Sequence, residues 1–419
     1  MTVTTLGARE RMLLAQRASR QIARLDDAAK TALLGAIADA IDRDSEEIVA
    51  ANRVDLERGA ESGLSASLLD RLTLDEARVG ALAEAVREVA GLPDPVARVL
   101  EEKTLPNGLH LQKVSVPFGV VGSIYEARPN VTVDIAALAL RSGNAVVLRG
   151  GTAAEQTNAA LVAAMRSALT ENGVDADAIQ TLDAFGRDGA TELMNARGIV
   201  DVLVPRGSAQ LIETVVTQSS VPVIETGAGV VHVYLDESAP LERASSIVVN
   251  AKAQRPSVCN AAETVLVHAG AAERIVAPVV AALHAAGVTV HGDDAVVRLA
   301  DGIVPATEED WATEYMSLDI AMRVVDDMDD ALDHIRRYST HHTESIITDD
   351  DAAAERFLAE VDSAVVMANA STRFTDGGEF GFGAEVGIST QKLHARGPMG
   401  LRELTSTKWV VRGSGQVRG

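Results

Sequence analysis

The chain has 419 residues, of which 47% are hydrophobic, 23% charged and 3% aromatic, and its formal net charge is −22. This length favours two or three domains, and the negative charge argues against a nucleic-acid or anionic-membrane partner. The single cysteine excludes an internal disulfide framework and fits a reducing cytosol. Because the N-terminal residues lack a signal-peptide core and no apolar run is long enough to span a bilayer, we expect a cytoplasmic protein.

The N-terminal part of the chain is expected to be helical. Over residues 8–92, apolar residues recur at spacings of three and four, the period of an amphipathic helix. Thr73, with Glu76 three residues later, predicts a capping box that starts the last of these helices. Residues 108–119 instead alternate apolar and polar side chains, which predicts an extended strand.

From residue 118 onward, short apolar runs alternate with helical segments. Five strands are expected, in FGVVGSIYE (118–126), AVVLRG (145–150), AIQTLDAF (178–185), IVDVLVPRG (199–207) and VPVIETG (221–227). This alternation predicts a doubly wound parallel sheet, which binds its ligand beyond the carboxyl ends of the strands. Those ends are rich in glycine and arginine, as suits a phosphorylated ligand held at helix N-termini.

A second alternation of strands and helices begins near residue 230 and predicts a second α/β domain. Cys259 lies near its start, in a loop that follows a helix. The spacing GFGAEVG (381–387) follows a turn-like segment and is rejected as a dinucleotide-binding fingerprint. A bound nucleotide would therefore need a different arrangement.

Cys259 has two interpretations from the residues alone. A lone cysteine is commonly a small buried hydrophobe, whereas cations such as Lys252 and Arg255 nearby in sequence favour a reactive thiolate. A zinc site with His341 and His342 is not expected, because no second thiol or metal-ligand spacing is present. A Cys–His–Asn hydrolase has no local support.

Two polar residues at strand ends are further candidates. Glu225 ends a predicted strand in VIETGAG and is either a general base or a solvated turn residue. Asn130 follows Arg128 and Pro129 and either donates to a developing oxyanion or caps a helix. The residue types alone leave both choices open.

Together these motifs resemble the aldehyde dehydrogenase superfamily, in family order and over nearly the whole chain. PFGVVGSIYEARPN resembles the strand that ends in the family's oxyanion asparagine, ETGAG the acid/base segment, and SVCNAAETVLV the nucleophile segment. The resemblance implies that Cys259 is the catalytic thiol, Asn130 the oxyanion donor and Glu225 the acid/base.

The same resemblance implies a site for NADPH and no metal. RSGNAVVLRGG and LVPRGS are similar to the segments that hold the cofactor's ribose and pyrophosphate, and ATEYMSLDI lies where the family has a glutamate at the nicotinamide ribose. The implied cofactor-binding residues are Arg149, Gly150, Gly151, Thr152, Gly207, Ser208 and Glu314. Arg149 in place of the usual lysine, and Thr152 in place of an acid that would repel a 2′-phosphate, favour NADPH.

Within the superfamily, the chain is most similar to the glutamate-5-semialdehyde dehydrogenases (gamma-glutamyl phosphate reductases) of proline biosynthesis, through residues 125–134, 325–346 and 376–409. The resemblance implies reduction of L-glutamyl 5-phosphate to L-glutamate 5-semialdehyde and phosphate through a thioacyl intermediate on Cys259, with functional coupling to a glutamate 5-kinase. Candidate holders of the anionic substrate are Arg128, His341, His342, Lys392 and Arg396. The alternatives are a hydrolytic NAD(P)-dependent aldehyde dehydrogenase and a non-catalytic nucleotide-binding protein of the same fold.

The expected architecture is an aldehyde dehydrogenase-like α/β fold with two doubly wound parallel-sheet domains and a small β oligomerisation flap. The cofactor-binding domain would comprise residues 1–104 and 117–228, the catalytic domain 229–397, with 366–397 able to cross back, and the flap 105–116 and 398–419. The flap segments alternate apolar and polar residues, and an open ribbon would leave strand edges exposed. We therefore expect a homo-oligomer, a dimer or a tetramer.

Overall fold

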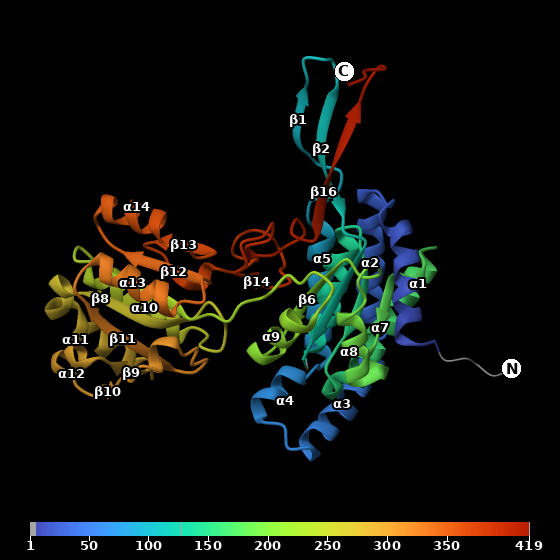
Figure 1. The fold of residues 1–419 in the computed structure, drawn as a ribbon. Helices are drawn as coiled ribbons and strands as arrows, with labels where there is room; N and C mark the ends of the chain where they lie inside the picture. Colours follow the sequence, from blue (N-terminus) through green and yellow to red (C-terminus); the bar gives the residue numbers. More distant parts are fainter. Residues whose placement is uncertain (1–5, 127, 419) are drawn as a thin grey trace. The chain divides into compact units, whose positions relative to one another are not determined.

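The computed structural model describes residues 6–126 and 128–418. The chain divides into two compact units (Figure 1). Unit 1 comprises Met1–Glu225, Gly381–Gly387 and Met399–Gly419, and unit 2 comprises Thr226–Phe380 and Ile388–Pro398. No described helix combines the length and the apolar character that crossing a bilayer requires.

A four-stranded parallel sheet forms the centre of unit 1. Its order is β5 (Ile179–Thr181), β4 (Ala145–Arg149), β3 (Val120–Tyr125) and β6 (Val202–Arg206). All six residues of β3 are buried. From β3 the chain adds β4 and β5 on one side and then returns to add β6 on the other. Such a reversal of strand order is where open α/β sheets bind their ligands.

The expected fifth strand at residues 221–227 is absent from this sheet, so that prediction is wrong. Only Val223 forms an isolated bridge, with Leu203. Pro222 accepts a hydrogen bond from the Leu203 backbone N–H (2.8 Å) but has no N–H to donate in return. The Ile224 N–H donates to Leu203 O (2.9 Å), which completes the one bridge, and the segment then continues into unit 2.

The described helices of unit 1 are α1 (Ala8–Ile22), α2 (Asp27–Arg43), α3 (Ser45–Glu61), α4 (Ala66–Leu72), α5 (Glu76–Gly91), α6 (Pro129–Arg141), α7 (Glu155–Glu171), α8 (Gly186–Met194) and α9 (Ala209–Gln218). The predicted capping box at α5 is wrong. Asp75 caps this helix by accepting from the Arg78 N–H (2.8 Å). Thr73 is instead the C-cap of α4, where its hydroxyl donates to Leu69 O.

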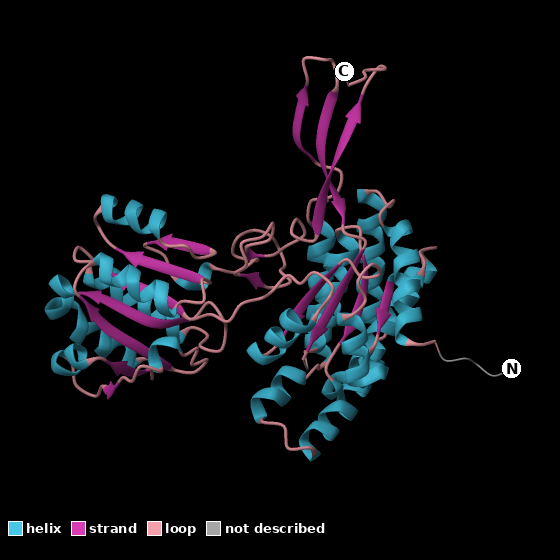
Figure 2. Cartoon of the chain, viewed as in Figure 1, coloured by secondary structure: helices cyan, strands magenta, loops and turns pink. Residues whose placement is uncertain are grey.

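A three-stranded antiparallel ribbon also belongs to unit 1. It pairs β1 (Val99–Thr104) with β2 (His110–Pro117) and β2 with β16 (Thr405–Arg412), and Figure 2 shows it extending away from the helices of the unit. Strand β1 was not expected, because its charged sequence VLEEKT lacks alternation. All six of its residues are exposed.

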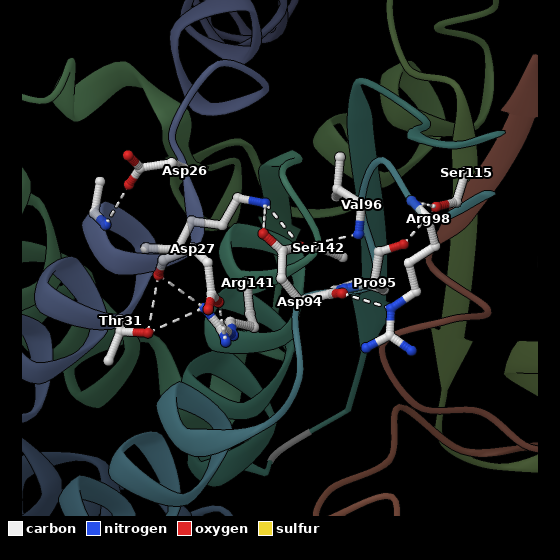
Figure 3. Close-up of polar contacts among 12 residues, drawn as sticks. Asp26, Asp27, Thr31, Asp94, Pro95, Val96, Arg98, Ser115, Arg141 and Ser142 are labelled. Carbon is white, nitrogen blue, oxygen red and sulfur yellow. Dashed lines mark hydrogen bonds and ion pairs between the residues drawn. The ribbon is translucent and has the colours of Figure 1, made fainter.

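Buried polar contacts fix the root of the ribbon to the helices of unit 1 (Figure 3). The ammonium group of Lys30, on α2, donates to both carboxylate oxygens of Asp94 (3.0 and 2.8 Å), which Figure 3 labels. Asp94 in turn accepts from the Val96 N–H, and its backbone O accepts from the Arg98 side chain. The Arg98 N–H donates to Ser115 Oγ on β2 (2.9 Å). Lys30 is only 2% exposed and Asp94 17%, so the ammonium group is removed from water while its partner is partly solvated.

Unit 2 is built on a seven-stranded parallel sheet. Its order is β10 (Val304–Pro305), β9 (Thr289–Gly292), β11 (Asp319–Val325), β8 (Ala262–His268), β7 (Val231–Leu235), β12 (Thr343–Ile347) and β13 (Val365–Ala368). Its described helices are α10 (Leu241–Ala253), α11 (Ala269–Ala285), α12 (Asp294–Leu299), α13 (Met328–Tyr338) and α14 (Asp351–Glu360). The short elements β9, β10 and α12 were not expected from the sequence.

Helices cover both faces of this second sheet. On β7, Val233 and Leu235 pack in one apolar cluster with α10 and α11 residues, and Tyr234 packs in the other with Phe357 of α14. A strand whose alternate side chains are all buried belongs to a sheet covered on both sides. The predicted doubly wound α/β fold is therefore confirmed.

Candidate active site

Cys259 lies in a turn between α10 and β8 of unit 2 and is only partly buried. The next residue, Asn260, is buried and anchors the turn. Its side-chain amide donates to Thr375 O (2.8 Å), and its backbone O accepts from the Thr372 hydroxyl (2.8 Å). The thiol is thus held on a fixed backbone without being sealed in apolar packing, which argues against the interpretation as a structural core cysteine.

Gly229 packs directly against the backbone of Cys259. A Cβ atom added at Gly229 would lie 1.6 Å from Cys259 O and 2.9 Å from its Cα. The Gly229 N–H donates to the carboxylate of Glu314 (2.8 Å). Glu314, predicted from the resemblance to contact a cofactor ribose, therefore has a backbone partner within unit 2, and its role toward a cofactor stays a prediction.

The Lys252 ammonium group is not free to stabilise the Cys259 thiolate, although the two residues are close in sequence. Its ammonium group is fully buried and paired with the carboxylate of Glu263. Burial lowers the pKa of Lys252, and burial raises the pKa of Glu263 to about 7, although the ammonium group partly opposes that rise. The pair joins the end of α10 to the start of β8 and so closes the base of the Cys259 loop.

Arg373 is a cation at the Cys259 loop that the sequence analysis missed. It lies in the short 3-10 helix η5 (Thr372–Phe374). Its Nε donates to Gln254 Oε1 (2.7 Å), just before the loop. Burial lowers the pKa of Arg373, and the charges of Asp376 and of the Cys259 thiolate act in the opposite direction. The only signal that could have found it is its position directly before the recognised segment 376–409.

Unit 1 contains a cavity of about 640 Å³ at the carboxyl ends of its strands. This volume lies within the range of small-molecule sites. Four predicted cofactor residues, one at the end of β4, two directly after it and one after β6, line the cavity together: Arg149, Gly151, Thr152 and Ser208. Glu126 and Arg187, which were not predicted, also line it. The structure thus brings together most of the residues that the resemblance assigned to the cofactor.

The turn after β4 is shaped by close backbone packing. A Cβ at Gly150 would lie 2.2 Å from Asn158 Nδ2, so only glycine fits there. The Gly150 N–H donates to the buried carboxylate of Asp183 (2.7 Å), whose pKa is raised by burial. Arg149 donates from Nε to Gly186 O (3.1 Å), which fixes its guanidinium at the cavity. These contacts hold the end of β4 in a defined position.

The N-terminus of α9 binds the carboxylate of Glu126. Ser208 is its N-cap, and its N–H and hydroxyl donate to the two carboxylate oxygens of Glu126 (3.0 and 2.7 Å). A Cβ at Gly207 would lie 2.8 Å from the same carboxyl group. Backbone N–H groups at a helix N-terminus favour negative charge, and Glu126 supplies that charge here, so a pyrophosphate bound at this turn would have to displace the Glu126 carboxylate.

Asn130 is the second residue of α6, and Arg128 occupies the N-cap position. The interpretation of Asn130 as a helix cap is therefore wrong. Its exposed side-chain amide donates to the carboxylate of Asp134 one turn later (3.1 Å). Burial raises the pKa of Asp134 to about 6. Glu225, the third predicted catalytic residue, is partly buried at the last position of the first segment of unit 1.

The side chains of Lys392 and Arg396, predicted to hold the substrate anion, surround the carboxylate of Asp362. Lys392 and Arg396 both form ion pairs with Asp362, and His341 Nδ1 lies 3.0 Å from the backbone O of the same residue. Lys392 and Arg396 hold the pKa of Asp362 below its usual value. One carboxylate thus faces two cations, so their positive charge is only partly offset.

His342 lies apart from this cluster in the core of unit 2. It is fully buried, and burial lowers its pKa to about 4. A neutral, buried imidazole has no charge with which to hold an anion. Within residues 6–126 and 128–418, no three His, Cys, Asp or Glu side chains gather as metal ligands.

Comparison with known proteins identifies the family. Residues 7–298 match the model of the aldehyde dehydrogenase family. The gamma-glutamyl phosphate reductase of Clavibacter michiganensis is 66% identical over 411 residues, which are 98% of this chain and 95% of the relative. That of Leifsonia xyli is 63% identical over 417 residues, covering 100% of this chain and 99% of the relative.

A solved structure supports the same assignment. The crystal structure of gamma-glutamyl phosphate reductase from Thermotoga maritima is 44% identical in sequence and covers 98% of this chain and 99% of its own, with a TM-score of 0.96. The chain belongs to the aldehyde dehydrogenase family and, within it, to the gamma-glutamyl phosphate reductases.

Proposed function

We propose that the protein is an oxidoreductase that reduces L-glutamyl 5-phosphate to L-glutamate 5-semialdehyde, with release of phosphate, in proline biosynthesis. The observation that carries this proposal is the partly buried Cys259, held on a fixed turn beside a guanidinium group, in a chain whose relatives are gamma-glutamyl phosphate reductases. Cations next to a thiol increase its thiolate fraction, and the thiolate is the nucleophile.

The covalent part of the reaction uses Cys259 as nucleophile. Its sulfur attacks the acyl carbon of the substrate, a carbon–sulfur bond forms, and the carbon–oxygen bond to phosphate breaks with the electron pair leaving on phosphate. The Asn130 amide and the Cys259 N–H are the proposed donors to the oxyanion that forms during attack. Glu225 is the proposed acid/base, which takes the thiol proton and returns a proton to the departing phosphate.

The cavity of unit 1 is the proposed site of the nicotinamide cofactor. Ser208 and Gly207 would hold the pyrophosphate at the N-terminus of α9, and Arg149 with Arg187 would hold a 2′-phosphate, which favours NADPH over NADH. NADPH, when bound, supplies the hydride that reduces the thioester carbon. The reduced adduct then expels the Cys259 thiolate, and the semialdehyde leaves.

The experiment that tests this function is a Cys259→Ala substitution assayed in the reverse direction. We expect the wild-type protein to oxidise L-glutamate 5-semialdehyde with NADP⁺ only when phosphate is present, and the variant to be inactive. The hydrolytic alternative, in which Glu225 activates water, predicts turnover without phosphate. Full activity of Cys259→Ala would exclude both covalent schemes.

We also propose that the ribbon of unit 1 joins copies of this chain. Leu100, Trp409 and Val411 of β1 and β16 are 57%, 46% and 53% exposed. Exposed apolar residues on strand edges favour pairing with another chain. Light scattering after gel filtration should find a dimer or larger species for the wild type and for the control Leu68→Glu, but a monomer for Trp409→Glu. An unchanged mass for Trp409→Glu would refute this proposal.

A further inference from the structure

The segment that follows β13 closes over the Cys259 loop. Residues 371–375 contact the loop through two hydrogen bonds, from Thr372 to Asn260 O and from the Asn260 amide to Thr375 O, both 2.8 Å long. Both contacts lie in the buried interior of unit 2. The position of Arg373, between Thr372 and Thr375, is therefore set relative to the nucleophile loop.

Only part of the Arg373 guanidinium group makes hydrogen bonds to the described residues. Its Nε donates to Gln254. Its Nη1 is buried and has no hydrogen-bond partner among the residues that the structure describes. Buried donors are nearly always paired, and an unpaired one calls for an explanation, because its desolvation is not compensated. An anion that arrives with the substrate would supply the missing acceptor.

Charged groups of both signs surround Arg373. Arg255 adds a second positive charge, and Asp376 and Glu379 supply the opposing carboxylates. The thiolate of Cys259 also interacts with the Arg373 charge. Of the cations considered for substrate binding, Lys392 and Arg396 are paired with Asp362, although Arg396 Nε is also buried without a hydrogen-bond partner among the described residues. The planar fork of an arginine matches the oxygens of a phosphoryl group.

We propose that Arg373 binds the phosphoryl group of the acyl phosphate substrate, and inorganic phosphate in the reverse reaction. The inference rests on the proposed function, because it takes Cys259 as the group that attacks the phosphorylated carbon. The phosphoryl group is joined through one oxygen atom to the carbon that the thiolate attacks, so a holder of this group must lie at the Cys259 loop. By binding it, Arg373 would position the acyl carbon and offset the charge of the leaving phosphate.

The test uses inorganic phosphate as the ligand and needs neither substrate nor cofactor. The rate at which iodoacetamide alkylates Cys259 is measured at increasing phosphate concentration, and phosphate binding is measured separately by calorimetry. We expect phosphate to protect the wild-type thiol and to bind with a measurable heat. In Arg373→Gln, the half-protecting concentration should rise by about tenfold or more, as expected for the loss of one charged hydrogen bond.

Two further variants make the result specific. Arg298→Gln, on α12, removes the same charge from another element of unit 2 and should leave phosphate protection unchanged. Arg373→Lys keeps the charge without the fork, should give an intermediate effect, and serves as the test if Arg373→Gln does not fold. Circular dichroism establishes the folded state of each variant.

The outcomes separate this inference from the proposed function. Equal phosphate affinity in the wild type, Arg373→Gln and Arg373→Lys would overturn the inference while leaving the role of Cys259 intact. Protection by L-glutamate but not by phosphate would assign Arg373 to the α-carboxylate and would also overturn it. Phosphate binding that depends on Arg373, in a protein whose Cys259→Ala variant remains active, would support the inference and refute the covalent mechanism.

Discussion

Gly229→Ala is the substitution whose consequence follows most directly from the geometry of the site. The added methyl group would lie 1.6 Å from Cys259 O, whereas real Cβ contacts are essentially never shorter than 3.0 Å. The two backbones must therefore separate by at least 1.4 Å. The Glu314 carboxylate holds the Gly229 N–H, so movement of Gly229 also strains that hydrogen bond.

A displacement of this size acts on the nucleophile itself. Misplacement of reacting groups by about 1 Å can lower a rate by about 10²-fold, so we expect kcat of Gly229→Ala to fall by at least about 100-fold. The affinity for NADPH should stay at the wild-type value, because the cavity of unit 1 contains neither residue. The phosphate-dependent oxidation of the semialdehyde by NADP⁺ measures kcat, and fluorescence titration measures NADPH binding.

Gly35→Ala is the matched control for this experiment. Gly35 lies within α2, and a Cβ there would meet no heavy atom within 4 Å. Alanine is the better helix former by about 0.5–1 kcal/mol, so this variant should be fully active and slightly more stable. A Gly229→Ala protein with kcat close to the wild-type value would refute the packing of Gly229 on the nucleophile backbone. A loss of activity in Gly35→Ala would show that the assay reports general damage.

Three other changes test separate parts of the structure. Asn130→Ala should lower kcat by about 10²–10³-fold without weakening NADPH binding, as expected for one lost oxyanion donor, and a normal kcat would exclude that role. Asp94→Ala leaves the buried Lys30 ammonium unpaired and should reduce the free energy of unfolding in urea by about 3–5 kcal/mol, whereas an unchanged unfolding midpoint would contradict the buried pair. Burial lowers the pKa of His342 to about 4, below its ordinary value of 6.5. Between these two pH values the unfolded chain binds a proton at this residue and the folded chain does not, so the free energy of unfolding falls as the pH drops from 6.5 to 4. His342→Gln should remove up to about 3 kcal/mol of this acid destabilisation, and an identical pH dependence of the urea midpoint in both proteins would contradict it.

The sequence predicted the parallel sheets well, because their strands are short apolar runs between helical segments. The sequence prediction failed where backbone hydrogen bonding or pairing with a neighbouring strand decided the structure. Pro222 has no N–H with which to extend the pairing toward the start of its segment, and only one bridge forms where the fifth strand of unit 1 was expected. The charged β1 is a strand only because β2 pairs with it.

In the candidate site too, local sequence patterns predicted some residues, whereas contacts between residues far apart in the sequence were missed. Arg149 and Ser208 were predicted as strand-end residues, and they line one cavity because the carboxyl ends of parallel strands meet at one edge. Lys252 was expected to act on Cys259 because the two are close in sequence, yet it is paired with Glu263. Arg373 could not be found by spacing, because 112 residues separate its neighbour Thr372 from Asn260.

The most direct measurement of the central claim is mass spectrometry of the protein after reaction with L-glutamate 5-semialdehyde and NADP⁺ in the absence of phosphate. We expect one NADPH formed per chain and a glutamyl group attached to the peptide that contains Cys259; added phosphate should release that group as the acyl phosphate and allow NADPH formation to continue. Continuous NADPH formation without phosphate, or an unmodified Cys259 peptide during turnover, would contradict it.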